Sequence, residues 1–251
     1  QIGALASEYA TTEEYALLGR LVRALGSENI DFRLRQTDPA FDAALTGAPW
    51  LGLPIAELDN LDRVLVVGSF LRKDHPLMAQ RLRQAAKRGT QILMVDSAAD
   101  DPLMPVAGRL TVAPSELPRA LAEVAVALAQ AKQAAVPAEF ASVTPGENAK
   151  IIAASLASGA NTAVLMGNLA VASAQASTLA ANGRAVADLA GGKFGFLTSG
   201  GNTVGGYLAE GVFDNVWYNY RVFLIFVLIL GIVGAVSRLV LKEGNAVFDK
   251  E

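Results

Sequence analysis

Two short runs of apolar residues constrain the fold of this chain more than any other feature. Residues 63–67 read RVLVV and residues 91–95 read QILMV. Uninterrupted apolar runs of this length are typical of strands that are buried on both faces of a parallel sheet. The stretch between them has helical periodicity over residues 74–88 and ends at Gly89. The sequence therefore predicts a strand–helix–strand unit.

The ends of the intervening helix determine how its neighbouring residues are interpreted. We expect Asp74 to cap the helix, with Pro76 in the first turn, where a missing N–H is tolerated. His75 then falls in that first turn, which favours a structural position over an acid–base role. The basic residues Arg72-Lys73 and those within 81–88 are typical of a solvated helix face, or of a contact surface for an acidic partner.

A second alternating unit follows the first. The sequence predicts two helices at 115–132 and 148–158, a strand at 162–166, a long alanine-rich helix at 170–189 and a strand at 194–197. Residues 64–69, VLVVGS, are echoed by residues 163–168, AVLMGN. Two alternating halves of this kind predict the α/β fold class, with a doubly wound, mostly parallel sheet.

The segments outside these units have weaker signals. Thr11 and Glu14 form a capping-box pattern that opens a helix, which we expect to end at Gly26. Residues 36–60 contain three prolines and are interpreted as a long surface loop. Residues 200–206, GGNTVGG, are interpreted as a glycine-rich loop.

The C-terminal region contains one long hydrophobic segment. Residues 222–241 are apolar on every side of a helix, and at 1.5 Å per residue they span about 30 Å, the thickness of a bilayer core. Trp217 and Tyr218 precede the segment, as in an interfacial aromatic belt. The other interpretation is a buried core helix. We therefore divide the chain into an α/β domain, 1–209, and a linker with a candidate transmembrane helix, 210–251.

Composition excludes several classes of site. The chain of 251 residues contains no cysteine and one histidine, so disulfides, cysteine-ligated clusters and multi-histidine metal sites are excluded. The net charge of −3 does not favour nucleic acid as a partner. The first residues have neither a basic start nor an apolar run, so they are not a signal peptide.

The candidate binding residues follow the predicted strands. Ligands of doubly wound folds bind at the carboxyl ends of the strands, where this sequence places Gly68-Ser69, Asp96-Ser97, Gly167-Asn168 and residues 198–200. Small residues there allow a phosphate or a pterin to approach backbone N–H groups. The favoured alternative is that they are only the tight turns that this fold needs, because no nucleotide-binding motif is present.

Three long segments resemble one known family. Residues 25–36 read LGSENIDFRLRQ, residues 62–76 read DRVLVVGSFLRKDHP, and residues 195–208 read GFLTSGGNTVGGYL. Together they resemble the large peripheral-arm subunit of bacterial NADH-quinone oxidoreductase, respiratory complex I, in the later part of its molybdopterin-oxidoreductase-like domain. The resemblance covers residues 1–209, and the chain departs from the family beyond that point.

The resemblance implies a fold, a cellular location and partner subunits. It implies a peripheral-arm subunit on the cytoplasmic face of the bacterial inner membrane, in contact with the other peripheral-arm subunits. The family carries electrons from NADH to quinone through iron–sulfur clusters, whose ligands lie in N-terminal regions that this chain does not contain. In distant relatives the strand ends corresponding to Gly68, Ser69, Gly167 and Asn168 line a molybdopterin guanine dinucleotide site, which the complex I subunit has lost.

Three hypotheses follow for the function. The first is a structural, non-catalytic part of the complex I subunit, with no redox centre and no cofactor in this chain. The second is a module that binds a pterin or a nucleotide at the strand ends. The third is an adaptor tethered to the membrane through residues 222–241, with the domain inside the cell and the short tail outside.

Overall fold

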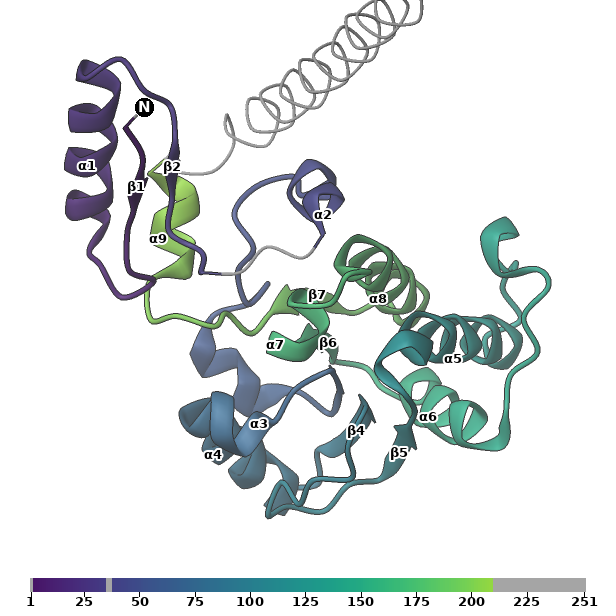
Figure 1. The fold of residues 1–251 in the computed structure, drawn as a ribbon. Helices are drawn as coiled ribbons and strands as arrows, with labels where there is room; N and C mark the ends of the chain where they lie inside the picture. The colour runs from purple at the N-terminus through teal and green to yellow at the C-terminus, as the bar shows by residue number, and fades with distance from the viewer. Residues whose placement is uncertain (1, 35–37, 210–251) are drawn as a thin grey trace, which may run out of the picture.

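The computed structural model describes residues 2–34 and 38–209 (Figure 1). Its larger part is a sheet of five parallel strands in the order β5-β4-β3-β6-β7. The strands are β3 (Arg63–Val67), β4 (Gln91–Asp96), β5 (Gly108–Thr111), β6 (Thr162–Met166) and β7 (Lys193–Phe196). The chain runs outward from β3 to one edge and then returns to the other side of β3, so the prediction of a doubly wound parallel sheet is confirmed.

Helices cover both faces of this sheet. One face packs on the 3₁₀ helix η1 (Ile55–Asn60) and on α4 (Pro76–Lys87), and the other packs on α5 (Leu117–Ala131), α6 (Glu147–Ala157) and α8 (Ala176–Ala190). Within β3, Val64 and Val66 face the first set of helices, whereas Leu65 and Val67 face the second. Burial on both faces is the reason that the strands read as continuous apolar runs.

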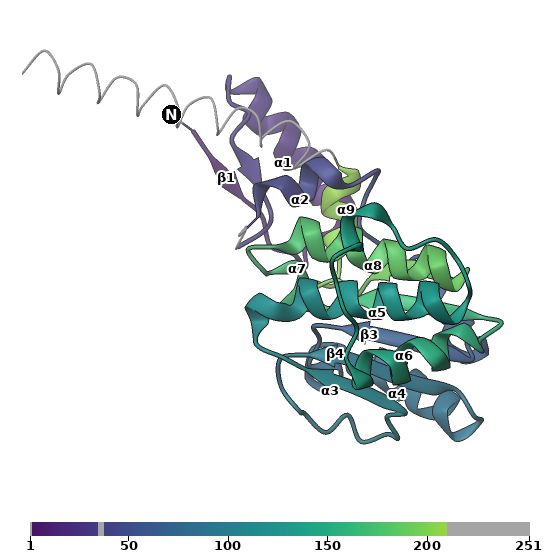
Figure 2. The same ribbon diagram turned by 90° about the vertical axis from the view of Figure 1, so that its right-hand side faces the viewer.

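A small lobe combines the first and the last described elements. It consists of β1 (Ala4–Leu5), α1 (Thr12–Ala24), β2 (Ile30–Asp31) and α9 (Thr203–Leu208). Figures 1 and 2 both show α1 beside α9 at one end of the molecule, and α1 contacts α9 directly. The core of the small lobe is a cluster of three aromatic rings, Tyr15, Phe32 and Tyr207.

The segment 36–60 is more regular than the prediction of a long surface loop. It contains a short helix, α2 (Pro39–Ala44), as well as η1. Asp38 caps α2 by accepting the backbone N–H of Ala40, and Pro39 occupies the first helical position. Prolines suggested a loop, but they are also tolerated at helix starts, and this is where Pro39 lies.

The prediction that Asp74 caps the helix is wrong, because the cap of that helix is His75. A one-turn helix, α3 (Leu71–Asp74), precedes α4, and Asp74 is its last residue. His75 occupies the junction, where it ends α3 and caps α4 without a capping hydrogen bond from its side chain. Pro76 is the first residue of α4, because a proline disfavours helical conformation in the residue before it.

Two further predictions are corrected at the end of the sheet. The predicted helix at 170–189 is divided into α7 (Asn168–Val171) and α8, and the predicted glycine-rich loop contains α9. The edge strand β5 was not predicted, because it has four residues and begins with a glycine. Short edge strands lack the continuous apolar pattern that identified the central ones.

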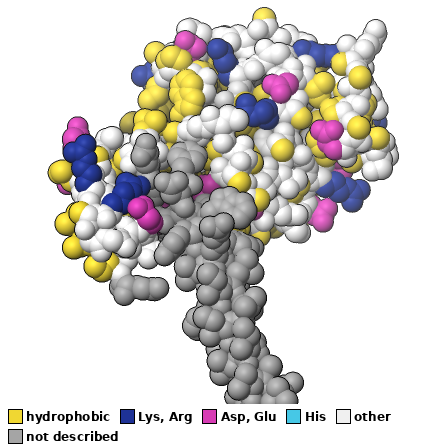
Figure 3. All heavy atoms as spheres, turned by 90° about the horizontal axis from the view of Figure 1, so that it is seen from above, with side chains coloured by type: hydrophobic (Ala, Val, Ile, Leu, Met, Phe, Trp, Pro, Cys, Tyr) yellow, Lys and Arg dark blue, Asp and Glu magenta, His cyan; other side chains and the backbone are white. Residues whose placement is uncertain are grey.

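Charged side chains are scattered over one face of the molecule. On the face drawn in Figure 3, acidic and basic side chains are interspersed, and neither sign forms a continuous patch.

Within residues 2–34 and 38–209, no helix combines the length and the apolar character needed to cross a bilayer. The candidate transmembrane helix at 222–241 lies outside the described residues and stays a prediction.

Candidate functional site at the carboxyl ends of the central strands

The register of the central strands brings the predicted site residues together. Val67 of β3 pairs with Val95 of β4 and with Met166 of β6, so the three strands end at the same level. Gly68, Asp96 and Gly167 follow these positions directly. The point at which the sheet changes winding direction therefore carries Gly68-Ser69 and Gly167-Asn168 side by side, each at the end of a strand.

The two loops are in direct contact with each other. Gly167 lies so close to Ser69 that a Cβ added to the glycine would be 2.3 Å from the serine Cβ. Gly68 has a positive φ of 59°, and its carbonyl oxygen accepts the backbone N–H of Leu169 at 2.9 Å. Glycine is needed at both positions, because any side chain would separate the loops.

This contact leaves no room for a phosphate or a pterin on the loops themselves. The N–H of Gly68 donates to the carbonyl of Val95 at 2.9 Å, and the N–H of Gly167 donates to the carbonyl of Val67 at 2.8 Å. Gly68, Ser69 and Gly167 are all buried. Since a bound phosphate needs free N–H groups and space, these three residues as folded do not fit a dinucleotide placed directly on them.

Several polar side chains at the strand ends carry one atom without a hydrogen-bond partner. We call the following residues the strand-end cluster: Ser69, His75, Asp96, Ser97 and Asn168. Within the described part of the chain, each has a buried side-chain oxygen or nitrogen atom with no hydrogen-bond partner. Buried polar atoms in native proteins are normally satisfied by protein, water or a ligand. The strand-end cluster therefore contains buried polar atoms that the fold itself does not satisfy.

Burial controls the protonation of the two titratable members of the cluster. Burial raises the pKa of the Asp96 carboxyl, while the backbone N–H groups of Ser97 and Ser69 act in the opposite sense. Burial also lowers the pKa of His75, against the charge of Asp74 and the side chain of Asn168 beside the imidazole ring. Both shifts favour the neutral form, because a charge is costly to bury.

A cavity lies beside the cluster, between the sheet and the small lobe. We call it the interlobe cavity; it has a volume of about 260 Å³ and is lined on the sheet side by Asn168 and by residues 196–199. The small lobe contributes Glu8 and Arg33. The walls are mainly apolar, with a few polar groups, a composition typical of small-molecule sites. Of the four predicted site residues, only Asn168 lines this cavity.

Arg33, on the small-lobe side of the cavity, belongs to an ion cluster that it forms with Asp31, Asp42 and Tyr207. Arg33 makes two hydrogen bonds of 3.1 Å to the Asp31 carboxylate and a further ion pair with buried Asp42. Tyr207 donates its hydroxyl to Asp42 at 3.0 Å. Burial would lower the pKa of the Arg33 guanidinium, but the two carboxylates raise it above its ordinary value, so Arg33 stays charged.

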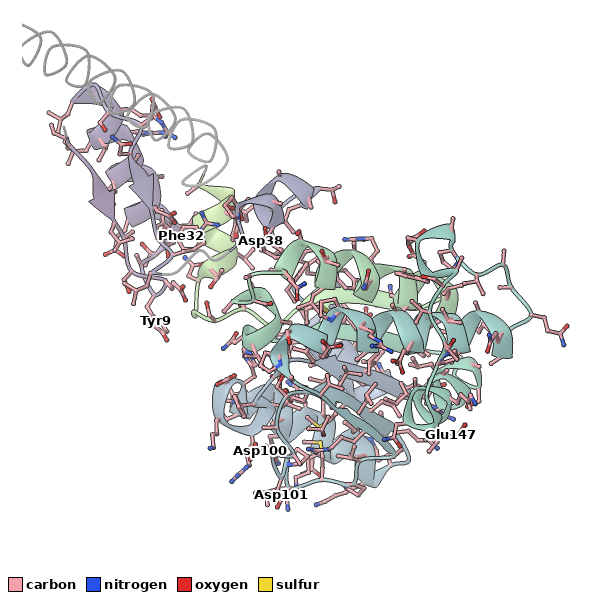
Figure 4. The ribbon with its side chains drawn as sticks, turned by 45° about the vertical axis from the view of Figure 1, so that its right-hand side comes forward. Tyr9, Phe32, Asp38, Asp100, Asp101 and Glu147 are labelled. Atoms are coloured by element: carbon pink, nitrogen blue, oxygen red, sulfur yellow. The ribbon has the colours of Figure 1, made fainter. Side chains whose placement is uncertain are left out.

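A second polar contact joins the start of α2 to α8. The Asp38 carboxylate accepts both the backbone N–H of Ser177 at 2.8 Å and its hydroxyl at 2.6 Å. Figure 4 shows Asp38 next to α9 and Phe32 inside the small lobe. Burial would raise the pKa of Asp38, but hydrogen bonds from Ser177 and Ala40 outweigh it and lower the pKa. Asp38 is therefore held as a carboxylate.

Sequence reasoning identified the strand ends but missed the other half of the site. Arg33 and Tyr207 lie 174 residues apart in the sequence, and nothing near either residue indicates their contact. Both lie in segments that carry the resemblance to the complex I subunit, which was the one available signal. Among the residues that the structure describes, no group of His, Cys, Asp or Glu side chains is arranged to hold a metal ion.

The strand order and the paired strand-end loops define a doubly wound α/β domain. Within that class, the model of the molybdopterin oxidoreductase family matches residues 1–222. The chain belongs to the molybdopterin oxidoreductase family.

Two individual proteins are similar to this chain, one in sequence and one in fold. The F420-dependent formate dehydrogenase subunit alpha of Methanocaldococcus jannaschii is 29% identical over 100 residues, which cover 38% of this chain and 15% of that protein. A chain of the formyltransferase/hydrolase complex from Methylorubrum extorquens, solved with methylofuran, superposes with a TM-score of 0.50 at 16% identity. That match covers 77% of this chain and 52% of the other and concerns the fold alone.

Proposed function

We propose that this chain is the molybdopterin-oxidoreductase-like part of the large peripheral-arm subunit of an NADH:quinone oxidoreductase. Its role there is structural: it packs against the electron-carrying domains and carries no redox centre and no cofactor of its own. The proposal rests on the three segments that resemble this subunit. The observation that carries the structural role is the closure of the strand ends, where Gly68 and Gly167 donate their N–H groups to the sheet itself.

The three segments that resemble the complex I subunit meet at one place in the fold, which supports a structural role. Residues 25–36 supply Arg33, and residues 195–208 supply Tyr207, which meets Arg33 and Asp42 in the ion cluster. Residues 62–76 supply Ser69 and His75, and His75 lies beside Asn168 at the edge of the interlobe cavity. All three segments thus surround the junction between the small lobe and the sheet.

The proposal also gives the cellular location of the domain and its partner subunits. The domain lies on the cytoplasmic face of the bacterial inner membrane, in contact with other peripheral-arm subunits. Residues 222–241 form a single-pass anchor for it. The iron–sulfur clusters of the assembly are carried by cysteine-containing regions that this sequence does not include.

Co-purification from the source organism tests this proposal. The full-length gene product carries an affinity tag, and membranes are extracted in a mild detergent. We expect the tagged chain to co-migrate with NADH:quinone reductase activity and with iron–sulfur spectra. We also expect the purified chain alone to contain no molybdenum, tungsten or pterin. Separation from the reductase activity would contradict the assignment to the complex, and a bound pterin would contradict the structural role.

A second candidate function is a module that binds a pterin or a nucleotide. The interlobe cavity favours it, because a space of about 260 Å³ with mainly apolar walls and a few polar groups, Asn168 among them, is typical of small-molecule sites. Such a ligand would lie beside the strand-end loops rather than on them. Organic extraction of the purified chain, followed by mass spectrometry, separates this function from the structural one.

The anchor at residues 222–241 is tested separately. Fractionation of cells that express the full chain, or a chain that ends at Ala209, compares their distribution between membrane and soluble fractions. We expect the shorter chain to leave the membrane when the rest of the complex is absent. An unchanged distribution would exclude the anchor without affecting the structural role of the domain.

A further inference from the structure

A groove lies along the outer side of β7, away from the strand-end cluster. We call it the edge groove; its volume is about 370 Å³. Its lining comes from the segment 45–50, from Arg184 on α8, from Phe194 and Phe196 on β7, and from α9. Its rim is apolar and accessible, since Trp50 is 52% exposed and Leu208 on α9 is 67% exposed.

Among the described residues, Arg184 is the one charged residue that lines the groove. Its guanidinium lies over the ring of Phe194, 4.7 Å from the ring centre. Within residues 2–34 and 38–209, no carboxylate lies within ion-pair distance of Arg184. A guanidinium that lies over a ring can still bind a carboxylate at two points through its N–H groups.

The composition of the edge groove is that of a protein-binding surface. Tryptophan, other aromatic residues and arginine are enriched in the parts of interfaces that contribute most binding energy. Phe194 and Phe196 pack edge to face with ring centres 5.1 Å apart, which gives the groove a rigid floor. An isolated exposed tryptophan needs no explanation, but one beside a hollow and an unpaired arginine does.

The mode of docking is restricted by the backbone next to the groove. The N–H of Phe196 on the outer edge of β7 already donates to the carbonyl of Trp50 at 2.8 Å, and Gly195 packs tightly on Leu51. A partner strand therefore cannot extend the sheet at this point. A partner must bind through its side chains.

We propose that the edge groove is a docking site for a peptide segment of a neighbouring polypeptide. That segment inserts one aromatic or large aliphatic side chain between Trp50 and Phe194 and presents a carboxylate to Arg184. The proposal deepens the structural role given above, on which it rests, by naming the surface and the chemistry of the partner.

Site-specific photocrosslinking tests the proposal in the full chain. The photoreactive amino acid p-benzoylphenylalanine replaces Trp50, the chain is expressed in its source organism, and crosslinked peptides are identified by mass spectrometry. We expect a crosslink to a segment of another polypeptide in which an apolar residue neighbours Asp or Glu. Arg184→Glu is expected to lower the crosslink yield about tenfold or more, because it replaces attraction with repulsion at a desolvated contact.

Matched variants make the result specific to Arg184. Arg20→Glu makes the same charge change on an exposed position of α1 and should leave the yield unchanged. Changing the acidic residue of the crosslinked partner to Lys should restore the yield with Arg184→Glu. A crosslink to residues 210–251 of the same chain, a crosslink to a second copy, no crosslink, or a yield unaffected by Arg184→Glu would each overturn the proposal.

The two proposals fail in different ways. Co-migration with NADH:quinone reductase activity is measured in the same strains. If the chain separates from that activity but still crosslinks to an acidic, apolar segment, the assignment to the complex fails and the edge groove stands. If it co-migrates without such a crosslink, the edge groove fails and the assignment stands.

Discussion

At the scale of single residues, the molecule holds its charges in place by pairing them. Arg33 is almost buried and is neutralised by two carboxylates, whereas the exposed pair Arg23–Glu28 lies in solvent. Buried pairs of this kind are costly to break, because the remaining partner keeps a charge that water no longer solvates. The ion cluster therefore specifies how β2, α2 and α9 meet.

Asp38 gives a prediction for the dependence of stability on pH. The hydrogen bonds from Ser177 lower its pKa below the unfolded value of about 3.9. Between the two pKa values the unfolded chain binds more protons, so the carboxylate stabilises the fold above the unfolded value, and this stabilisation is lost as the pH falls through the folded pKa. Asp38→Asn should therefore lower the free energy of unfolding at pH 7, by an amount that shrinks below about pH 4.

Denaturant titrations at several pH values measure this difference. Asparagine also caps helices, so Asp38→Asn keeps the cap on α2 and removes the charge. Glu139→Gln removes an exposed carboxylate and serves as the control, with an expected change within about 0.5 kcal/mol. A difference for Asp38→Asn that stays constant from pH 7 to pH 3 would argue against a held carboxylate.

At the scale of elements, close backbone contacts decide which segments can lie together. The alanine-rich helix α5 is buried on nearly every side, because the sheet, α6 and α8 all pack against it. Lys132 at its end donates to the carbonyl of Ala190 at 2.8 Å and so satisfies the terminus of α8. Small side chains make this close packing possible.

Gly195 gives a prediction for the packing of β7. A Cβ added there would be 1.8 Å from the backbone oxygen of Leu51, a contact that a side-chain rotation cannot relieve. We expect Gly195→Ala to lower the free energy of unfolding by about 1–3 kcal/mol or more, as overpacking does. Gly201→Ala is the control, because its added Cβ meets only the Tyr9 side chain, at 3.4 Å. Equal effects from the two changes, measured by chemical denaturation, would contradict this account.

At the scale of the whole molecule, residues from both ends of the described chain complete one lobe. Tyr207 on α9 closes the aromatic cluster of Tyr15 and Phe32, and its hydroxyl binds Asp42. The small lobe is therefore stable only when the chain has returned from β7 to its beginning. The sheet has two hydrophobic cores of its own.

Tyr207→Ala is expected to open the small lobe selectively. Removal of a buried aromatic ring costs about 3–5 kcal/mol. Hydrogen–deuterium exchange should show faster exchange in α1 and β2, while β3 and β6 stay protected. Tyr9→Ala is the control, since Tyr9 is 75% exposed and should alter exchange little. Uniform acceleration across the sheet would show that the two lobes unfold as one unit.

The sequence alone determined the elements whose signals are local. The strands at 63–67, 91–96 and 162–166 were predicted because burial on both faces leaves a continuous apolar run, and the helix at 12–24 because its capping box lies within four residues. From these elements the class of sheet also followed, since alternating strands and helices form parallel sheets.

The tertiary structure alone decided everything that joins distant residues. The closure of Gly167 on Ser69, the contact of Arg33 with Tyr207, and the meeting of Trp50 with Arg184 in the edge groove all join segments far apart in the sequence. A periodic pattern reports which face of an element is buried, but not which other element buries it. The strand ends could thus be named from the sequence, whereas their closure, the interlobe cavity and the edge groove required the folded chain.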